Sequence, residues 1–220
     1  MINGSIPSDG GHLLLSADEK ARVIAAFPNI KPYIREYIGA VGLINGNTRH
    51  CLWLADCPPD LIRNTPPILE RLERVRATRE ASPKVPTQKK ALYPSLFTED
   101  RQPRSGNYLA FPRSSSENRR YIPIAYLSCD IIASNDIQFV PEATVYDFGV
   151  LTSVMHMAWL MTVSGRIKSD PRYSNTIVYN NFPWPQTPTE AQTAAVEKAA
   201  QAVLDARARF PDATLADLYD

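Results

Sequence analysis

The sequence predicts an α+β fold, in which short strands form a mixed β-sheet and helices flank it at both ends. Short apolar runs bounded by turn residues are typical of strands, and several occur in the middle of the chain. Ser16 and Glu19 have the spacing of a helix-capping box near the N-terminus, and Thr187 and Glu190 repeat it near the C-terminus. Nineteen prolines divide the 220 residues into short elements instead of forming one linker.

The first predicted helix begins at the Ser16 capping box. It carries Val23, Ile24 and Phe27 on one face, and it closes before Pro28. This spacing is that of an amphipathic helix lying on a core.

A buried strand is predicted at 50–54, followed by a second helix. Thr65, with prolines at the next two positions, is expected to cap that helix. Its apolar stripe consists of Ile68, Leu72 and Val75, and its arginines are expected elsewhere on the helix surface: Arg71, Arg74, Arg76 and Arg79.

The middle of the chain is predicted to hold one long loop and then strands. Residues 81–106 are rich in Pro, Lys and Gln, which indicates a loop that is mobile without a ligand. The strands are expected at 107–112, 121–127 and 137–140.

The last third is predicted to be mainly helical. A strongly apolar helix spans 147–163, a strand candidate follows at 174–180, and 181–185 forms an extended Pro-Trp-Pro turn. The capping box at 187–190 then starts an alanine-rich helix that ends at about Phe210.

Charge is distributed unevenly along the chain. The net charge is +1, yet residues 63–120 hold thirteen Lys and Arg against six Asp and Glu, whereas residues from 186 onward hold three against six. A basic middle is typical of a surface that faces a polyanion. An arginine-rich helix that only keeps the protein soluble explains the charge equally well.

The composition is that of a soluble globular protein, with 44% hydrophobic and 21% charged residues. No apolar run is long enough to cross a bilayer, and the N-terminus has no secretory signal pattern. Three cysteines, an odd number, argue against a disulfide framework. The sequence therefore predicts a cytoplasmic protein.

Familiar catalytic patterns are missing from the chain. It has no glycine-rich phosphate loop, no nucleophile elbow, no paired-histidine helix and no CxxC. Cys51 and Cys57 have no partnering pair, so we expect core thiols and no metal site. His156 lies in an apolar helix, which favours a core histidine bonded to the backbone over a catalytic base.

One segment concentrates side chains that are able to read bases, from Arg113 to Pro123. Arginine donates as a fork to O6 and N7 of guanine, and glutamate accepts from the amino group of cytosine. Glu117 and Arg119 are two residues apart, so on an extended backbone they point the same way and fit the two halves of one G·C pair. Taken alone, the segment is better explained as a solvated charged turn.

Segments spread over nearly the whole chain resemble the C-terminal part of the MmeI-type restriction–modification enzymes, which join a nuclease, an adenine-N6 methyltransferase and a target-recognition domain. The Asn-Asn-Phe-Pro-Trp-Pro stretch is the most specific of them. The matching segments are 7–15, 49–54, 71–76, 115–124, 148–159, 165–166, and 172–174 through 179–185.

The resemblance implies a DNA target-recognition domain at 1–140 and a mostly helical C-terminal region at 141–220. The family's catalytic motifs belong upstream, so no catalytic residue is carried over. S-adenosylmethionine, with Mg²⁺ as a further candidate, is expected only for the full-length enzyme, and no cofactor is expected for this chain. The implied partners are double-stranded DNA and a methyltransferase domain, in the same polypeptide or as a separate subunit.

In the family, base choice is associated with a Glu-x-Arg pair, which matches Glu117 and Arg119; Tyr121 occupies a further family position, and the base read there is left open. Phosphate contacts position such a domain on the duplex, and base contacts specify the site. The residues expected to contact the DNA backbone are Lys84, Lys89, Lys90, Arg101, Arg104, Arg113, Ser115, Ser116 and Arg120.

Two other functions stay open. The helices at 151–163 and 187–210 would suit an interaction scaffold that docks on a methyltransferase or nuclease subunit, with DNA contact incidental. A free-standing enzyme that uses His156 is disfavoured, because no catalytic partner accompanies the histidine.

Overall fold

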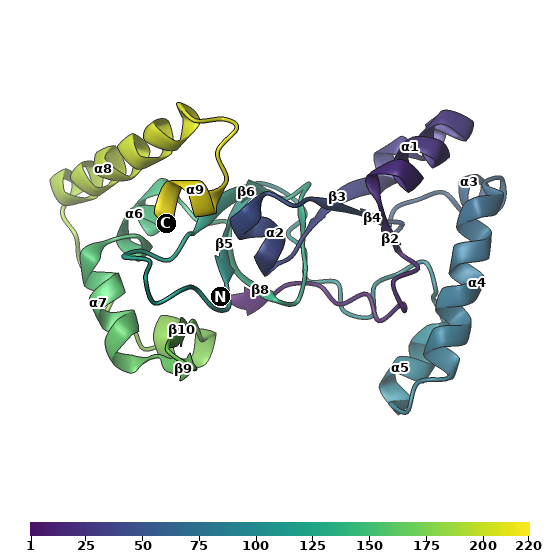
Figure 1. Ribbon diagram of the computed structural model, residues 1–220, viewed down its shortest axis with the longest axis horizontal. Helices are drawn as coiled ribbons and strands as arrows, with labels where there is room; N and C mark the ends of the chain where they lie inside the picture. Colours follow the sequence, from purple (N-terminus) through teal and green to yellow (C-terminus); the bar gives the residue numbers. More distant parts are fainter.

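The computed structural model describes residues 1–220 as an elongated molecule, with sheets in the middle and helices at both ends (Figure 1). Helices and strands are both present, so the predicted α+β class is confirmed. The strands are β1 (Ile2–Asn3), β2 (Leu14–Leu15), β3 (Ile34–Ile38), β4 (Arg49–Leu52), β5 (Asn107–Pro112), β6 (Ala125–Ser128), β7 (Ile132–Ala133), β8 (Ile137–Pro141), β9 (Gly165–Ile167) and β10 (Asp170–Arg172).

The helices fall into two groups, one at each end of the molecule, with the short α2 near the middle (Figure 1). No helix is long and apolar enough to cross a membrane. The α-helices are α1 (Ala17–Ala26), α2 (Ala40–Asn45), α3 (Pro59–Arg63), α4 (Pro66–Glu80), α5 (Val85–Lys89), α6 (Val145–Leu151), α7 (Val154–Val163), α8 (Glu190–Ala208) and α9 (Leu215–Tyr219); short segments of other helix types lie at Pro28–Tyr33, Lys90–Leu92 and Asn175–Tyr179.

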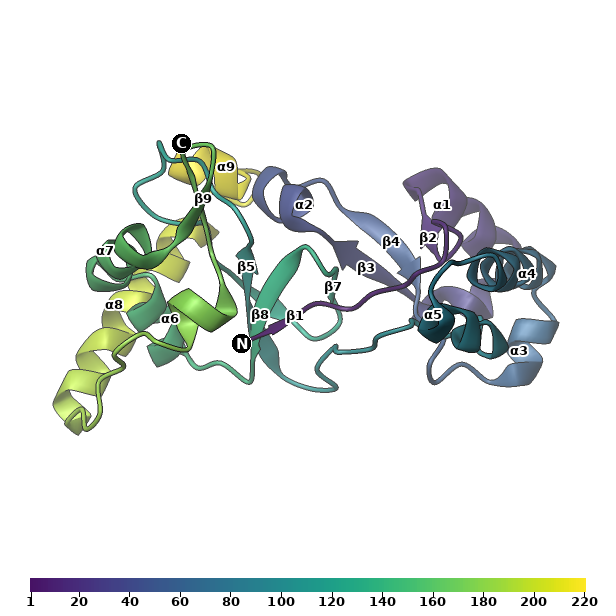
Figure 2. The same ribbon diagram turned by 90° about the horizontal axis from the view of Figure 1, so that it is seen from below.

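Two four-stranded sheets form the middle of the molecule. The first has the order β1-β8-β5-β6 and is antiparallel throughout, with Ala110 opposite both Phe139 and Ala125. The second has the order β2-β4-β3-β7, and its β3–β7 pair is parallel. Only this second sheet is mixed, and it contains the strand predicted at 50–54, whereas the strands predicted in the middle of the chain lie in the antiparallel first sheet. Figure 2 shows the chain after β1 running from the first sheet toward the helical end that holds α4.

The predicted apolar stripe of α4 packs into the same core as the second sheet. Ile68, Leu72 and Val75 are buried in one cluster with Leu52 and Trp53. The capping box of α1 is also present, because the Ser16 hydroxyl accepts from the Glu19 amide and Glu19 accepts from the Ser16 amide. Apolar spacing and local capping thus predicted this end of the molecule correctly.

One arginine of α4 does not lie on the surface as predicted. Arg79 is 1% exposed, and its guanidinium donates to five backbone carbonyl oxygens at 2.7–3.0 Å. Two carbonyls belong to Pro7 and Ser8, and three belong to Lys90, Tyr93 and Leu96. The segment predicted as a loop at 81–106 is partly helical. The Arg79 side chain joins it to the N-terminal segment, because it bonds carbonyl oxygens of both.

Two predicted helix starts need correction. Thr65 stands at the N-cap of α4, but its hydroxyl donates to the Leu61 carbonyl oxygen and caps nothing. The capping box of α8 is formed by Thr189 and Gln192 instead of Thr187 and Glu190. Both threonines of the Thr-Pro-Thr sequence are plausible caps, and only the backbone geometry selects the second.

The predicted helix at 147–163 is two helices, α6 and α7. The Thr152 hydroxyl donates to the Phe148 carbonyl oxygen at the end of α6. Ser153 is the N-cap of α7, and its hydroxyl accepts from the His156 amide. Hydroxyl side chains that bond nearby backbone groups compete with helix continuation, which explains the break.

Two predicted strands also differ. Residues 121–124 are irregular, and the strand of this region begins at Ala125. The strand predicted at 174–180 is wrong, because Asn175–Tyr179 forms a π-helical turn capped by the Ser174 hydroxyl, which accepts from the Ile177 amide.

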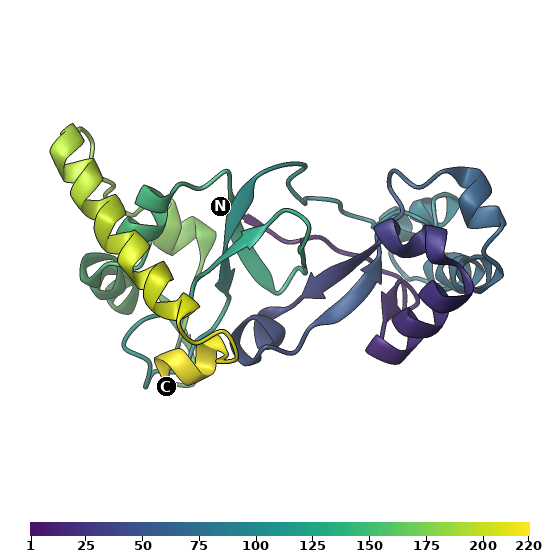
Figure 3. The ribbon, with the colours of Figure 1, turned by 90° about the horizontal axis from the view of Figure 1, so that it is seen from above.

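The long helix α8 crosses the end of the molecule and packs against α6 (Figure 3). Gly149 permits this contact, because a Cβ there would lie 2.7 Å from Val196 Cγ1 and 3.1 Å from Ala200 Cβ. The resulting cluster joins Phe111 and Ile124 to Phe148 and Ala200, so α8 and the segment before β6 share one core.

Candidate nucleic-acid interface

The segment that carries Glu117 and Arg119 is fastened to β10. Ser114 forms a β-bridge with Arg172, and the Tyr173 amide donates to the Arg113 carbonyl oxygen at 2.9 Å. The Glu117 amide donates to Asp170 Oδ1 at 3.0 Å. The backbone of this segment is thus held in place by strand pairing that no local pattern in the segment predicts.

Glu117 and Arg119 do not lie on an extended backbone as expected. The Arg119 amide donates to the Ser116 carbonyl oxygen at 3.1 Å, which closes a turn around Glu117 and Asn118. The alternation of an extended strand therefore does not set the directions of these two side chains. Glu117 is exposed, whereas the side chain of Arg119 is only 12% exposed.

The partner of Arg119 is Asp220, which no sequence pattern identified. Arg119 Nη2 donates to Asp220 Oδ2 at 2.9 Å, and Nε donates to Oδ1. These hydrogen bonds lower the pKa of the Asp220 carboxyl. The ion pair uses the side edge of the guanidinium, formed by Nε and Nη2, and Nη1 has no protein partner.

Arg207 on α8 connects the C-terminal helices to the same region. Its Nη1 donates to the Ile124 carbonyl oxygen at 2.7 Å, and its Nη2 bonds the Tyr219 hydroxyl. The guanidinium also lies over the rings of Phe148 and Tyr219, 5.1 Å from each centroid. Arg207 therefore holds α9, and with it Asp220, beside the segment after Tyr121.

The residues predicted to contact the DNA backbone are spread over the length of the molecule. Lys84, Lys89 and Lys90 are exposed and have no acidic partner, and they lie on or beside α5 at the end opposite the C-terminus (Figure 1). Arg101 pairs with Glu99, and Arg104 pairs with Asp100. The three lysines are thus free charges, whereas the two arginines already have carboxylate partners.

The remaining predicted backbone contacts lie around the Glu117 turn. Arg113 is half-buried and donates to Asn3 Oδ1 at 2.9 Å, and Arg120 is exposed with its guanidinium 5.5 Å from the Tyr121 ring centroid. Ser116 accepts from the Asn118 amide. Ser115 is 3% exposed and its hydroxyl is buried, so its predicted contact with DNA does not fit this conformation.

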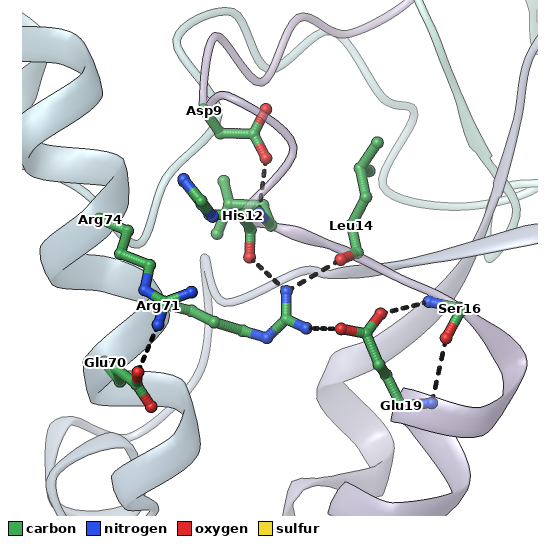
Figure 4. Close-up of polar contacts among 9 residues, drawn as sticks. Asp9, His12, Leu14, Ser16, Glu19, Glu70, Arg71 and Arg74 are labelled. Atoms are coloured by element: carbon green, nitrogen blue, oxygen red, sulfur yellow. Dashed lines mark hydrogen bonds and ion pairs between the residues drawn. The ribbon is translucent and has the colours of Figure 1, made fainter.

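A second basic site, which the sequence did not single out, lies between α1 and α4. A cavity of about 490 Å³ is lined there by Arg22, Arg71 and Arg74 together with Glu19 and Glu70. Figure 4 shows that Arg71 points across to the His12 and Leu14 carbonyl oxygens and to Glu19, while Arg74 pairs with Glu70 at 2.5 Å. Arg71 joins α4 to α1 through Glu19, whereas the Arg74–Glu70 pair lies within α4, so both arginines already have carboxylate partners in the cavity.

His156 is a core histidine, as predicted, although its partner differs. It is fully buried, its Nε2 lies 2.8 Å from the Tyr173 hydroxyl instead of a backbone group, and its ring packs edge-on against Phe182. Burial lowers the pKa of His156 to about 4. The imidazole ring bonds the Tyr173 hydroxyl and no carboxylate orients it, so the geometry offers no catalytic relay.

Cys51 and Cys57 are buried in the cluster below the second sheet, which confirms that they are core thiols. Burial raises the pKa of the Cys51 thiol to about 12. A thiol held protonated in this way is a poor nucleophile and a poor metal ligand.

The fold, with two sheets in the middle and a C-terminal helical region, is that of a target-recognition domain. Residues 1–186 match the family described as MmeI, target recognition domain, and residues 188–220 match the family described as MmeI, C-terminal domain. The chain belongs to these two families.

Two relatives extend the comparison. DNA methyltransferase A of Bacillus subtilis (strain 168) is 39% identical over 218 residues, which cover 99% of this chain and 24% of that protein. The structure of the Type IIL restriction-modification enzyme MmeI in complex with DNA matches all of this chain and 29% of that one, with 40% identity and a TM-score of 0.93. The chain therefore spans less than a third of each relative.

Proposed function

We propose that this chain reads the sequence of duplex DNA for an adenine-N6 DNA methyltransferase whose catalytic domains lie outside it. The observation that carries the proposal is the Arg119–Asp220 pair, within a chain that belongs to a target-recognition family. Asp220 occupies the side edge of the guanidinium. The end edge, formed by Nη1 and the second hydrogen of Nη2, remains able to donate as a fork to guanine O6 and N7.

The roles divide between the two ends of the molecule. Arg119 and the exposed Glu117 would contact base edges in the major groove, with Tyr121 beside them, and the free lysines Lys84, Lys89 and Lys90 would contact phosphates. Arg101, Arg104, Arg113 and Arg120 remain candidates for phosphate contacts that must first exchange a present partner.

The chemistry belongs to the proposed upstream domains. Methylation of an adenine amino group requires that base to leave the stack and enter a catalytic pocket. S-adenosylmethionine would bind in the methyltransferase domain, and Mg²⁺ would serve a nuclease if one is fused. This chain would bind the duplex and set its position relative to the catalytic domains of a cytoplasmic enzyme. Within it, the division at residue 140 into recognition and C-terminal regions stays a prediction.

The salt dependence of binding tests the phosphate role. Affinity for duplex DNA should fall linearly with salt on logarithmic axes, by about 0.9 in slope for each phosphate neutralised. Replacing Lys84, Lys89 and Lys90 together with alanine should flatten that slope, whereas Lys198→Ala on α8, in the acidic C-terminal part, should leave it unchanged. An affinity that does not vary with salt would exclude the proposal.

An interaction scaffold is a second candidate, favoured by one observation. Val154 and Met155 at the start of α7 are 62% and 71% exposed, so part of this apolar helix lacks a covering element. Such side chains are typical of a docking face when they are contiguous. A chain that forms a tight complex with a methyltransferase core and shows no affinity for DNA would support this alternative.

A further inference from the structure

A polar cavity of about 380 Å³ is lined in part by Arg113 and Arg172, which flank the Glu117 segment and its partner strand, and its volume is within the size range of sites for small organic groups. Its floor is the edge of the first sheet, where Asn3 of β1 and Gln138 of β8 are register neighbours. Arg113, which follows β5, and Arg172 of β10 also line the cavity. The Ser114–Arg172 bridge makes the cavity wall and the Glu117 turn parts of one backbone unit.

Two buried polar atoms of this cavity have no partner in the protein. Gln138 is 5% exposed, and its Oε1 accepts no hydrogen bond, while its Nε2 makes only a long contact of 3.4 Å to Asn3 Oδ1. Arg113 uses Nη2 for Asn3 and leaves its buried Nε free. A buried polar group without a partner costs free energy, so such groups are rare unless a ligand or water satisfies them.

The two free atoms differ in kind, and this difference selects the ligand. Gln138 Oε1 is an acceptor, whereas Arg113 Nε–H is a donor. A phosphodiester of the DNA backbone offers acceptors only and would leave Gln138 unsatisfied. The edge of each nucleobase carries both donors and acceptors, so a base would satisfy both groups at once.

The rest of the cavity fits the remainder of a nucleotide. Arg172 is exposed, and Ile177 is a half-exposed apolar side chain able to lie against a ring. Asn175 and Ile177 are presented by the π-helical turn. π-helical turns are uncommon and occur frequently at functional sites.

We propose that this cavity binds a single nucleobase unstacked from DNA, read by Gln138 and Arg113, with Arg172 on its phosphate. The proposal rests on the proposed function, because it places DNA on the face that carries the Glu117 turn. It adds a second point of base contact that lies outside the Glu-x-Arg pair.

Duplexes with and without one unpaired, looped-out base test the proposal. A looped-out base has already left the stack, so the chain need not supply the unstacking energy. The 220-residue chain should bind the looped-out duplex about tenfold more tightly than the fully paired one, consistent with one bidentate base contact. Gln138→Met keeps the side-chain length and removes the free acceptor, so it should erase that preference while leaving the fold intact.

The matched control is Gln201→Met, on α8, which should keep the preference. Equal affinity for the two duplexes would overturn the cavity proposal, and salt-dependent binding of the paired duplex would still sustain the proposed function. If millimolar inorganic phosphate abolished the preference, the cavity would be an anion site and the proposal would be overturned. If the Gln138→Met variant retained the preference, the cavity would hold water instead of a base, and the proposal would again be overturned.

Discussion

Arg119 and Asp220 are separated by 101 residues, yet Asp220 accepts two hydrogen bonds from the side edge of the Arg119 guanidinium, with Nη2–Oδ2 at 2.9 Å. Arginine has several rotatable bonds, and fixing them costs conformational entropy. Because the Asp220 carboxylate already holds the side edge, part of this entropy is lost before DNA binds. The end edge of the guanidinium stays free. Asp220 is therefore a positioning residue for the proposed base contact.

Replacing Asp220 with asparagine should separate positioning from charge. The variant loses the ion pair and one negative charge, so binding to scrambled duplex should stay equal or tighten. Discrimination between the preferred duplex, selected from a random pool, and a scrambled one should decrease because Arg119 is no longer oriented. Affinities for both duplexes at one salt concentration measure this, and unchanged discrimination would contradict the positioning role.

Replacing Arg119 and Lys89 in turn tests the division between base and phosphate contacts. Arg119→Ala should cost about 1–3 kcal/mol on the preferred duplex and relax one position of the site. Lys89→Ala should weaken all sequences alike and reduce the salt slope by about 1. Competition binding against a panel of single-base variants distinguishes the two patterns. If both replacements produced the same pattern, the proposed division would be wrong.

The sequence predicts what depends on neighbours along the chain. The capping box at Ser16 and the Ile68 stripe are local patterns with a fixed period, and both are found as expected. Glu117 and Arg119 were predicted as base-reading residues from their chemistry and from the family resemblance, and the turn that they form matches the alternative of a charged turn instead of an extended backbone. Asp220 and the bridge to Arg172 lie far from that pair in sequence, and no periodicity relates them to it.

Side chains that suit either of two environments account for the other differences between the prediction and the structure. Arg79 occurs among surface arginines on α4, and its identity does not show that five carbonyl oxygens converge on it. Thr152 and Ser153 are compatible with a continuous helix or with a break, and in the structure their hydroxyls bond the Phe148 carbonyl oxygen and the His156 amide, which ends α6 and starts α7. Tertiary contacts overrule local preference at such positions.

Arg79 should be the arginine of α4 on which stability depends most. Arg79→Met removes the donor for five carbonyl oxygens of two separate segments, and it should lower the free energy of unfolding by about 3 kcal/mol or more. Arg76→Met, at an exposed position of the same helix, should change it by no more than about 0.5 kcal/mol. Urea denaturation of both variants gives the comparison, and similar midpoints would show that the Arg79 network contributes little.

His156 should make the fold sensitive to mild acid. Burial lowers its pKa to about 4 in the folded chain, while an unfolded histidine has a pKa of about 6.5. Between these values the unfolded chain binds the extra proton, so the free energy of unfolding should fall as the pH falls through this window, by about 3 kcal/mol in total. The pKa of the partly exposed His50 is lowered as well, and it acts in the same direction.

Two variants at this site distinguish titration from the loss of a hydrogen bond. His156→Gln keeps a polar partner for the Tyr173 hydroxyl and removes the titrating ring, so stability should become nearly independent of pH between 6.5 and 4.5, apart from the contribution of His50. Tyr173→Phe removes the hydrogen bond at 2.8 Å but leaves the buried imidazole, so it should lower stability and keep the pH dependence. Urea midpoints measured across this pH range give both results. A His156→Gln variant that retains the full slope would assign the acid sensitivity to other groups.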